Sequence, residues 1–396
     1  MQNSLNAFVF VVCGTNEHLE TLHFSLKYLK KFTKQDIIIL TDLSRNEMSI
    51  DHDKIIDVET PKAFNNHQAS IYLKTGIHLF LPKGKTYCYL DTDVVAIKDG
   101  VGNIFNAYIA PITFAPDHCQ LRTFSPYAVN CSCLASHGKE VQELEKVLSQ
   151  YDKNKDLGPD EMNAQKRLIN LFNTKKQNKL AYLWVMIKYA LSRKVFHFED
   201  FYFDKKLKTW FETKTGNAVL FDFSRIAKSV AQNSSFKWST LKRMWVNGKN
   251  ENVYLLRCNH LKEAIAKDFN IKVHEANWQH WNGGVFLFND ESHNFLNAWH
   301  QKTLSVFELR NWKTRDQGTL IATVWEFGLE KHPTLNKKWN FIADYNNAGL
   351  EFKKEGKFTD DYWKTSYQAS FVHIYHHWGD SSWDLWNWVE ANPLNK

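Results

Sequence analysis

The sequence contains no run of about 18 apolar residues, the length that a membrane-spanning helix requires. Its most apolar window, residues 181–187, ends at Lys188. No basic leader precedes the apolar stretch near the amino terminus, which is short and rich in β-branched and aromatic residues, unlike a signal core. We therefore expect neither a transmembrane span nor a secretory leader, and we expect a cytoplasmic protein.

Cysteine is also scarce, with six in 396 residues. A chain of this length does not need disulfides to fold, so free thiols are predicted. Cys131-Ser-Cys133 with His137 suggests zinc, but no CxxC pair accompanies it. Cys258-Asn-His260 is the only other candidate. These spacings favour free thiols over a zinc site.

The composition is 43% hydrophobic and 15% aromatic, which is sufficient for two or three domains and excludes disorder, collagen-like repeats and a disulfide miniprotein. Strands are predicted at 7–13, 36–40, 86–90, 108–115, 284–288 and 371–375, and helices at 19–29, 69–80, 139–151, 161–172, 291–307 and 317–327. This order predicts an α/β sheet domain interrupted by a mainly helical insertion. The expected boundaries are 1–118, 119–270 and 271–396.

Positive charge is concentrated in one segment. The chain carries +7, but residues 161–250 contain 18 Lys and Arg against 6 Asp and Glu, a net +12. Aromatic residues are interleaved with these charges: Trp184, Phe196, Phe198, Phe201, Tyr202, Trp210, Trp238 and Trp245. The segment is interpreted either as ordinary solvated helix faces or as a surface for anionic lipids or an acidic glycan. Nucleic acid is not expected, because no nucleic-acid-binding signature accompanies the charge.

The apolar strand predicted at 86–90 ends in Asp91-Thr92-Asp93. Open α/β sheets bind ligands at the carboxyl ends of their strands. Two carboxylates two residues apart share a face in a continuing strand and need a cation between them to stay ionised. Oxygen ligands of this kind suit Mg²⁺ or Mn²⁺. A solvated pair of aspartates is the alternative.

Three further clusters follow in the second half of the chain. Asn282, Gly283 and Gly284 precede a buried strand, where glycine lets the backbone approach a ligand and also suits a simple turn. Asp316-Gln317 opens a predicted helix, where Asp316 also suits a capping residue. The last cluster contains histidines and a glycine and favours contact with a metal or a phosphate: His373, His376, His377 and Gly379.

In this order, the four clusters resemble the GT-A fold glycosyltransferases of family 8, the glycogenin and bacterial galactosyltransferase type. The resemblance covers roughly residues 7–118 and 271–385. It implies a nucleotide-sugar-binding mixed sheet, with the divalent metal held by Asp91, Asp93 and His373. It also implies nucleobase contact by Thr15 and Asn16, and it places the remaining residues at the donor: Lys74, Thr92, Asn282, Gly283, Gly284, Asp316, Gln317, His376 and Gly379.

The chain departs from the family at several positions. Gly379-Asp-Ser-Ser-Trp383 contains no lysine, whereas the family has one there that holds the leaving phosphate, and His376 or His377 is the proposed substitute. His18-Leu19 stands where the family tends to place a base-stacking tyrosine. A long insertion also replaces a short connection of the family. A related GT-A family is therefore an alternative to family 8.

The resemblance implies hexose transfer from a nucleotide sugar, with a UDP-sugar favoured, to a glycan or lipid-linked glycan with retained configuration. Peripheral contact with the inner face of a membrane would suit the basic segment. A phosphatase of the haloacid-dehalogenase type is one alternative, because Leu90 to Val95 and Gly379-Asp380 to Asp384 imitate its motifs. A non-catalytic carbohydrate-binding protein is the other, given fifteen tryptophans, most of which core packing should explain.

Overall fold

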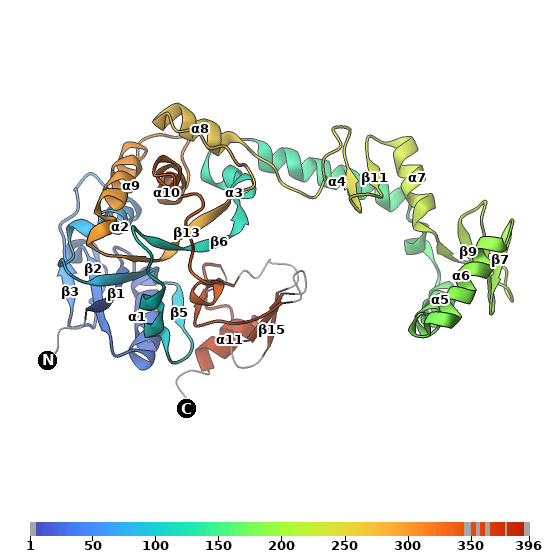
Figure 1. Cartoon of the computed structure of the whole chain (residues 1–396), viewed down its shortest axis with the longest axis horizontal. Helices are drawn as coiled ribbons and strands as arrows, with labels where there is room; N and C mark the ends of the chain where they lie inside the picture. Colours follow the sequence, from blue (N-terminus) through green and yellow to red (C-terminus); the bar gives the residue numbers. More distant parts are fainter. Residues whose placement is uncertain (1–4, 344–349, 354–356, 361–364, 377, 392–396) are drawn as a thin grey trace. The chain divides into compact units, whose positions relative to one another are not determined.

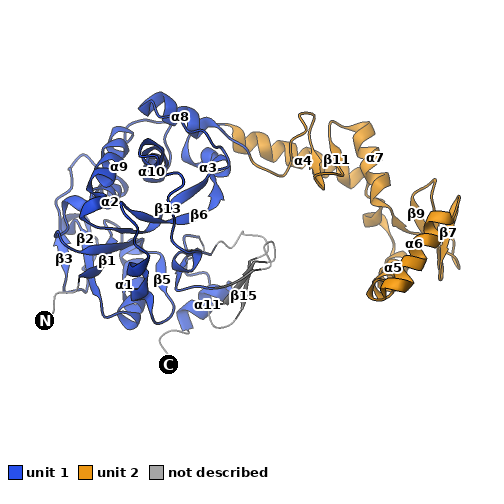
Figure 2. Cartoon of the chain, in the orientation of Figure 1, with its two compact units in different colours: residues 1–131, 257–396 blue, residues 132–256 orange. Residues whose placement is uncertain are grey.

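The chain folds into two units, described from a computed structural model (Figures 1 and 2). Unit 1 comprises residues 1–131 and 257–396, and unit 2 comprises residues 132–256. The structure describes residues 5–343, 350–353, 357–360, 365–376 and 378–391. Within these ranges, no helix has both the length and the apolar character needed to cross a membrane.

A six-stranded sheet forms the centre of unit 1, in the order β3-β2-β1-β4-β13-β6. Strands β1 to β4 are parallel where they pair, whereas β13 runs antiparallel to both of its neighbours, so the sheet is mixed and the predicted α/β class is confirmed. The strands are β1 (Asn6–Val11), β2 (Asp36–Thr41), β3 (Ile55–Asp57), β4 (Thr86–Leu90), β6 (Thr113–Gln120) and β13 (Gln279–Phe288).

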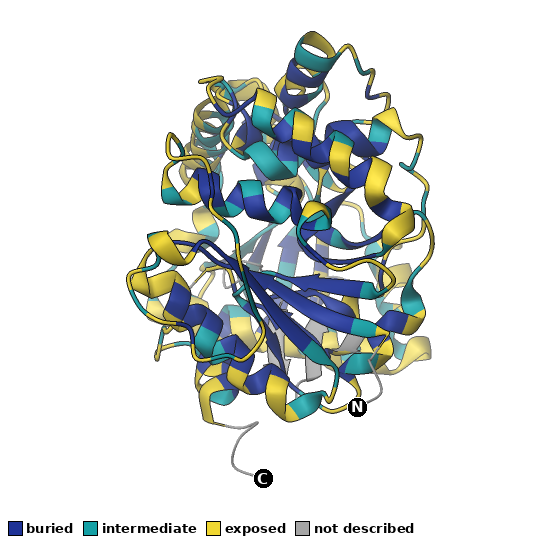
Figure 3. Ribbon diagram, turned by 90° about the vertical axis from the view of Figure 1, so that its left-hand side faces the viewer, coloured by how far each residue is buried: buried dark blue, intermediate teal, exposed yellow. Residues whose placement is uncertain are grey.

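Helices cover both faces of this sheet, which explains why its strands are nearly continuous apolar runs. Alternate residues of β1 enter two different cores: Val9 packs with α2, α9 and α10, and Phe8 packs with α1. Figure 3 shows these buried strands between helices whose outer faces are exposed. The helices of unit 1 are α1 (Asn16–Phe32), α2 (Asn66–Thr75), α3 (Leu121–Ala128), α8 (His260–Phe269), α9 (His293–Ser305), α10 (Arg315–Glu326) and α11 (Asp384–Ala391).

Two smaller sheets complete unit 1. In the first, ordered β14-β18-β5, His373 of β18 lies opposite Val94 of β5. Short 3-10 helices join the elements, at η1 (Leu43–Arg45), η2 (Ile77–Leu79), η3 (Val101–Ala107), η5 (Asp290–Ser292) and η6 (Lys337–Trp339). The strands of the two sheets are β5 (Val94–Ala96), β14 (Phe341–Ile342), β18 (Phe371–His373), β15 (Leu350–Lys353), β16 (Lys357–Asp360) and β17 (Thr365–Gln368).

Unit 2 contains long helices together with two antiparallel sheets, and the sheets were not predicted from the sequence. Residues 195–204 alternate between buried aromatic and more exposed side chains, a period of two that forms a hairpin. Its elements are α4 (Cys133–Tyr151), η4 (Lys153–Asp156), α5 (Pro159–Gln177), α6 (Lys179–Leu191), β7 (Val195–Phe198), β8 (Phe201–Asp204), β9 (Thr209–Glu212), β10 (Ala218–Phe221), α7 (Phe223–Asn233), β11 (Lys237–Ser239) and β12 (Met244–Val246).

Most aromatic residues of the basic segment are buried in cores of unit 2. Phe196, Phe198, Phe201 and Trp210 pack together in one cluster, and Trp245 lies in a second. Core packing therefore accounts for them, whereas Trp184 on α6 is 63% exposed.

The unit boundaries lie inside the predicted insertion limits of 119 and 270. Helices α3 and α8 belong to unit 1, because Leu121 and Leu261 are fully buried against its central core. The strand expected at 108–115 begins only at Thr113. Pro111, which has no N–H for a strand ladder, precedes it.

Candidate functional site

Asp91, Asp93 and His373 come together where the central sheet of unit 1 meets the β14-β18-β5 sheet. One possible ligand atom from each of the three lies within 4.8 Å of the others, and His373 Nε2 is 3.2 Å from Asp93 Oδ1. The pairing of β18 with β5 produces this meeting, since His373 lies opposite Val94, the residue after Asp93. The Ile374 N–H also donates to the Asp93 carbonyl oxygen at 2.9 Å.

The Asp91-Thr92-Asp93 segment is a turn and not the continuing strand that was considered. Strand β4 ends at Leu90, and the Val94 N–H donates to the Asp91 carbonyl oxygen at 3.0 Å, which starts β5 in a new direction. The Thr92 carbonyl oxygen accepts a hydrogen bond from the Ser25 hydroxyl of α1 at 2.5 Å. The two carboxylates therefore reach one site because the turn is held, not because they share a strand face.

His373 is oriented by a chain of side-chain amides. Its Nδ1 lies 3.0 Å from Asn340 Oδ1, and the Asn340 amide nitrogen donates to Asn282 Oδ1 at 2.9 Å. The Asn282 amide nitrogen in turn donates to Asp117 Oδ2 at 3.0 Å. A proton on Nδ1 that is donated to Asn340 leaves Nε2 free to bind a cation, the usual arrangement for a metal-bound imidazole.

Charge interactions inside this group are strong. Burial alone would raise the pKa of Asp93 and lower that of His373, but their mutual attraction reverses both, so the pKa of Asp93 is lowered and that of His373 is raised. Asp93 Oδ1 is a buried oxygen that faces His373 Nε2. Two carboxylates and an imidazole suit Mn²⁺ or Mg²⁺, so these residues fit a divalent cation.

Lys74 lies between Asp91 and Asp316. Its Nζ is 3.1 Å from Asp91 Oδ1 and 3.3 Å from Asp316 Oδ2, and its side chain is 12% exposed. Burial would lower the pKa of this ammonium, but the two carboxylates raise it above its ordinary value. The Tyr89 hydroxyl donates to Asp91 Oδ1 at 2.5 Å. Lys74 thus connects the metal-ligand group to the start of α10.

The glycine pair lies directly against these side chains. A Cβ atom on Gly284 would lie 2.6 Å from His373 Cε1 and 2.9 Å from Asp91 Oδ2, so only glycine fits without a shift of the ligands. On Gly283, a Cβ atom would lie 3.1 Å from Gln317 Oε1. The sequence predicted that the backbone at these glycines approaches a bound molecule. In the structure, the backbone at Gly284 approaches the side chains of the candidate metal ligands His373 and Asp91.

Gln317 holds the backbone of β13. Its Oε1 accepts from the Gly283 N–H at 2.9 Å, and its Nε2 donates to the Trp281 carbonyl oxygen. Both ends of the amide are engaged, so Gln317 positions Gly283. Asp316, whose carboxylate meets Lys74, is the residue of this pair that faces the site.

Thr15 and Asn16 lie at the start of α1, after the glycine turn that ends β1. Gly14 has φ +114°, a conformation that favours glycine, and a Cβ there would lie 2.8 Å from the Asn66 side chain. Both Thr15 and Asn16 are exposed, and the Asn16 N–H donates to Glu47 Oε2 at 2.9 Å. Because β1 and β4 are parallel neighbours, this loop leaves the same sheet edge as Asp91.

The segment after His373 is only partly tied to the site. His376 is exposed, with its ring centroid 4.0 Å from that of Tyr375, and Gly379 is exposed with φ +77°. No contact in the described part of the chain joins either residue to Asp91 or Asp93. His377 lies outside the described residues.

Sequence reasoning missed Asn340, Tyr89 and Asp117. Asp117 is 8% exposed, and the nearby His280 and the hydrogen-bonding His118 lower its pKa against the opposing effect of burial. None of the three lies in a recognisable motif. Tyr89 alone had a signal, because it precedes Asp91 by two residues at the end of β4.

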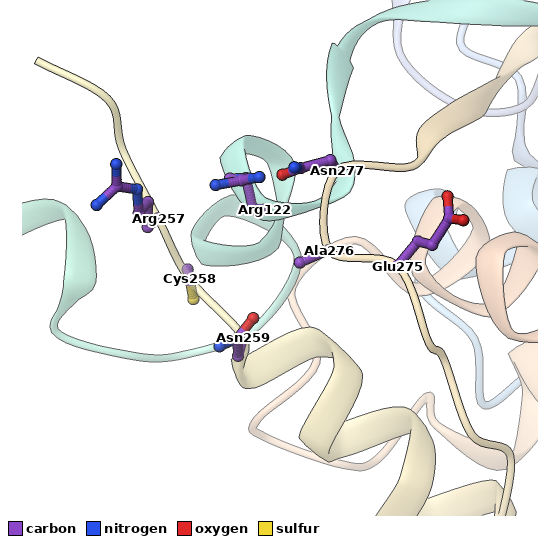
Figure 4. Close-up of a pocket in the computed structure, with 7 residues that line it drawn as sticks. All are labelled: Arg122, Arg257, Cys258, Asn259, Glu275, Ala276 and Asn277. Atoms are coloured by element: carbon purple, nitrogen blue, oxygen red, sulfur yellow. The ribbon is translucent and has the colours of Figure 1, made fainter. Parts of the chain in front are cut away.

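Unit 1 also contains a basic pocket of about 410 Å³ (Figure 4). Burial and the charge of Arg257 both lower the pKa of Arg122, so the two guanidinium groups repel each other. The Arg122 Nε is buried without a hydrogen-bond partner among the described residues. The pocket is lined by Arg122, Arg257, Cys258, Asn259, Glu275, Ala276 and Asn277.

No known protein family and no curated protein matches the chain. Among solved structures, it is similar to the apo form of the bifunctional glycosyltransferase WbbM, with 9% identity, a TM-score of 0.38, and coverage of 95% of this chain but 46% of WbbM. Apo mouse xyloside xylosyltransferase 1 gives 9% identity and a TM-score of 0.37, covering 93% of this chain and 98% of that one. The galactosyltransferase LgtC, in complex with donor and acceptor sugar analogues, gives 13% identity and a TM-score of 0.21, covering 28% of this chain and 46% of LgtC. Similarity at these TM-scores supports no conclusion about what the chain binds.

Proposed function

We propose that the chain is a metal-dependent glycosyltransferase that moves a hexose from a nucleotide sugar, with a UDP-sugar favoured, to a hydroxyl of a glycan or glycolipid. One observation carries the proposal: Asp91, Asp93 and His373 converge, and Lys74 links them to Asp316. At least one residue from each of the four motifs belongs to this group or contacts it. The mixed α/β sheet, with this site beside the carboxyl end of β4, agrees with a GT-A-like fold.

The chemical problem of this reaction is a diphosphate leaving group that gains negative charge as the anomeric bond breaks. Mn²⁺ or Mg²⁺, held by Asp91, Asp93 and His373, would supply Lewis-acid neutralisation of that charge. Asn340 keeps His373 Nε2 available, and the Lys74 ammonium adds a fixed positive charge beside Asp91.

The other residues have roles at the sugar and the nucleotide. Asp316 is assigned to the sugar carbon, where positive charge develops, and Gln317 keeps the Gly283 backbone in place beside it. Thr15 and Asn16 are assigned to the nucleobase, and Thr92, His376 and Gly379 to the phosphates. Retention of the anomeric configuration follows from the family resemblance.

The first test is calorimetric titration of the full chain with UDP, in excess Mn²⁺ and again in EDTA. We expect binding in Mn²⁺ that is lost in EDTA and in the Asp93→Asn variant. Asp53→Asn, which changes an exposed carboxylate before β3, is the matched control and should bind normally. Metal-dependent binding would then be followed by screening UDP-sugars for hydrolysis. Absence of binding in both buffers would reject the UDP donor and direct the search to other nucleotides.

The phosphatase alternative assigns Asp91 as nucleophile and Asp380 and Asp384 as metal ligands. Asp380 Oδ1 accepts from the Ser382 N–H at 2.9 Å in a local turn, and Asp384 is exposed at the start of α11. Neither belongs to the Asp91, Asp93 and His373 group. Phosphate release from simple phosphomonoesters by the wild-type chain, lost in Asp91→Asn, would favour this alternative.

The carbohydrate-binding alternative depends on exposed aromatic surfaces. Trp281, Trp299 and Trp312 are among the largest fully buried side chains, and Trp278 and Trp339 are also buried. Core packing therefore accounts for these five. Binding of a glycan without turnover of any sugar nucleotide would favour this second alternative.

We further propose that α6 of unit 2 contacts an anionic membrane that carries a lipid-linked acceptor. One face of α6 packs Val185 and Tyr189 against a buried cluster, whereas large apolar side chains on its other side are 39–77% exposed: Leu180, Leu183, Trp184, Ile187 and Leu191. Lys176, Lys179 and Lys188 are exposed nearby. An exposed apolar face with lysines at its edges complements an anionic bilayer surface.

Sedimentation with vesicles tests this contact. We expect binding to vesicles containing phosphatidylserine, weaker binding at high salt, and loss of binding in the Leu183→Ala/Trp184→Ala double variant. Leu241→Ala, which removes a 93% exposed leucine elsewhere in unit 2, is the control and should bind normally. Equal sedimentation of the double variant and wild type would reject α6 as the contact.

A further inference from the structure

A second cluster of metal-ligating side chains lies in unit 1 and shares no residue with the candidate donor site. Cys131 Sγ is 3.7 Å from Cys258 Sγ, and Cys258 Sγ is 3.2 Å from His260 Nδ1. All three ligand atoms lie within 4.8 Å of one another. Cys258 is 4% exposed. His137, which the sequence paired with Cys131, is not in this group.

These separations agree with the dimensions of a zinc site. Zinc bonds of about 2.3 Å to sulfur set two tetrahedral thiolate ligands about 3.8 Å apart. A disulfide, in contrast, requires about 2.05 Å between the sulfur atoms. The distance between Cys131 and Cys258 therefore corresponds to two thiolates on one ion.

A buried hydroxyl contacts the Cys258 sulfur. The Ser125 hydroxyl donates to Cys258 Sγ at 3.1 Å, and its oxygen accepts from the Leu261 N–H at 2.9 Å, which keeps the hydroxyl proton available for the sulfur. Ser125 is fully buried, so it is a fixed partner of the kind that orients metal ligands.

Positively charged groups also lie near Cys258. Cys258 comes two residues before α8, whose amino-terminal end carries a positive partial charge. It also lines the basic pocket, next to Arg257 and with Arg122 (Figure 4).

We propose that Cys131, Cys258 and His260 hold a structural zinc ion. These residues supply two sulfurs and one nitrogen to the ion, ligand atoms of the kinds that zinc prefers. The ion joins the end of the first segment of unit 1 to the start of its second segment, 127 residues later. The ion thereby holds together the two points at which the chain leaves and re-enters unit 1.

The test measures metal in the full chain purified under reducing conditions without chelator. An Asp91→Asn/Asp93→Asn variant serves as the background, so that the candidate donor site cannot contribute metal. We expect one zinc per chain by mass spectrometry of the metal, lost in a further Cys131→Ser/Cys258→Ser change. Cys13→Ala, which removes a buried thiol outside the cluster, is the control and should keep its zinc.

Cobalt substitution keeps the test decisive if the double cysteine variant fails to fold. Cobalt in the background variant should give the sulfur-to-metal charge-transfer bands and the intense visible bands of tetrahedral thiolate coordination. Protein without zinc, whose cobalt spectrum lacks these bands, overturns the proposal. Neither readout depends on transferase activity, so this result and that of the UDP titration are independent.

Discussion

Asn340 Oδ1 lies 3.0 Å from His373 Nδ1, and this contact joins a residue without any motif to the third ligand of the candidate donor site. Asn340 is 3% exposed and follows η6, while His373 ends β18. Its amide nitrogen is already committed to Asn282, so its oxygen must face the imidazole. The asparagine therefore determines which ring nitrogen of His373 is available to a cation.

Replacement of Asn340 by alanine should weaken metal binding about 10- to 100-fold, because the imidazole loses its orienting partner. Titration of Mn²⁺ against the UDP-bound chain measures this. Asn336→Ala removes a nearby capping side chain that touches no ligand, and should leave the affinity unchanged. Equal Mn²⁺ affinity in Asn340→Ala and wild type would show that Asn340 has no positioning role.

Gly284→Ala should abolish metal-dependent nucleotide binding while it costs about 1–3 kcal/mol of stability, the usual range for overpacking. The added methyl group has no room between His373 and Asp91, so the ligands must move apart. Gly248→Ala, where a Cβ meets nothing within 4 Å, is the matched control. Thermal melts and UDP titration separate the two effects. A Gly284→Ala chain that still binds UDP with Mn²⁺ would contradict the site geometry.

Lys74→Met should destabilise the chain by about 3–5 kcal/mol, because it leaves two partly buried carboxylates without their cation. Mn²⁺ should restore part of the lost melting temperature, since a bound divalent ion neutralises Asp91. Lys54→Met, which removes a half-exposed partner of Asp36, should cost at most about 1 kcal/mol. A melting temperature of Lys74→Met that does not respond to Mn²⁺ would separate Lys74 from the metal site.

Stability should fall as the pH is lowered from about 6.5 to about 4, in part because of His300. Burial lowers the pKa of His300 to about 4, so the unfolded chain binds a proton in this window that the folded chain does not. Protonation of His300 in the unfolded chain lowers the free energy of unfolding by up to about 3 kcal/mol. Urea unfolding of His300→Gln should show a shallower dependence on pH. An unchanged slope would mean that His300 does not titrate as its burial implies.

The elements that were predicted correctly are those with a pattern within a short stretch of sequence. The apolar runs that form β1, β2, β4 and β13 and the leucine stripe of α1 are signals of period or composition, and each element was found close to its predicted position. The candidate ligands Asp91 and Asp93 were found for the same reason, because they directly follow a buried strand.

Features that depend on distant pairing were not predictable. Asn340 has no local signal, and its role follows from its contacts with Asn282 and His373. Cys131 and Cys258 meet across 127 residues, so their spacing along the chain carried no information about a shared ion. The short strands of unit 2 were missed because their aromatic runs lie between long helical patterns.

The pairing of β18 with β5 has a consequence for synthesis of the chain on the ribosome. Val94 precedes His373 by 279 residues, so the strand that completes the candidate donor site is made long after the two carboxylates. The carboxylates of Asp91 and Asp93 must remain without this partner while unit 2 and most of unit 1 are translated. A growing chain truncated before β18 should therefore have much of its central sheet and still be unable to retain a donor.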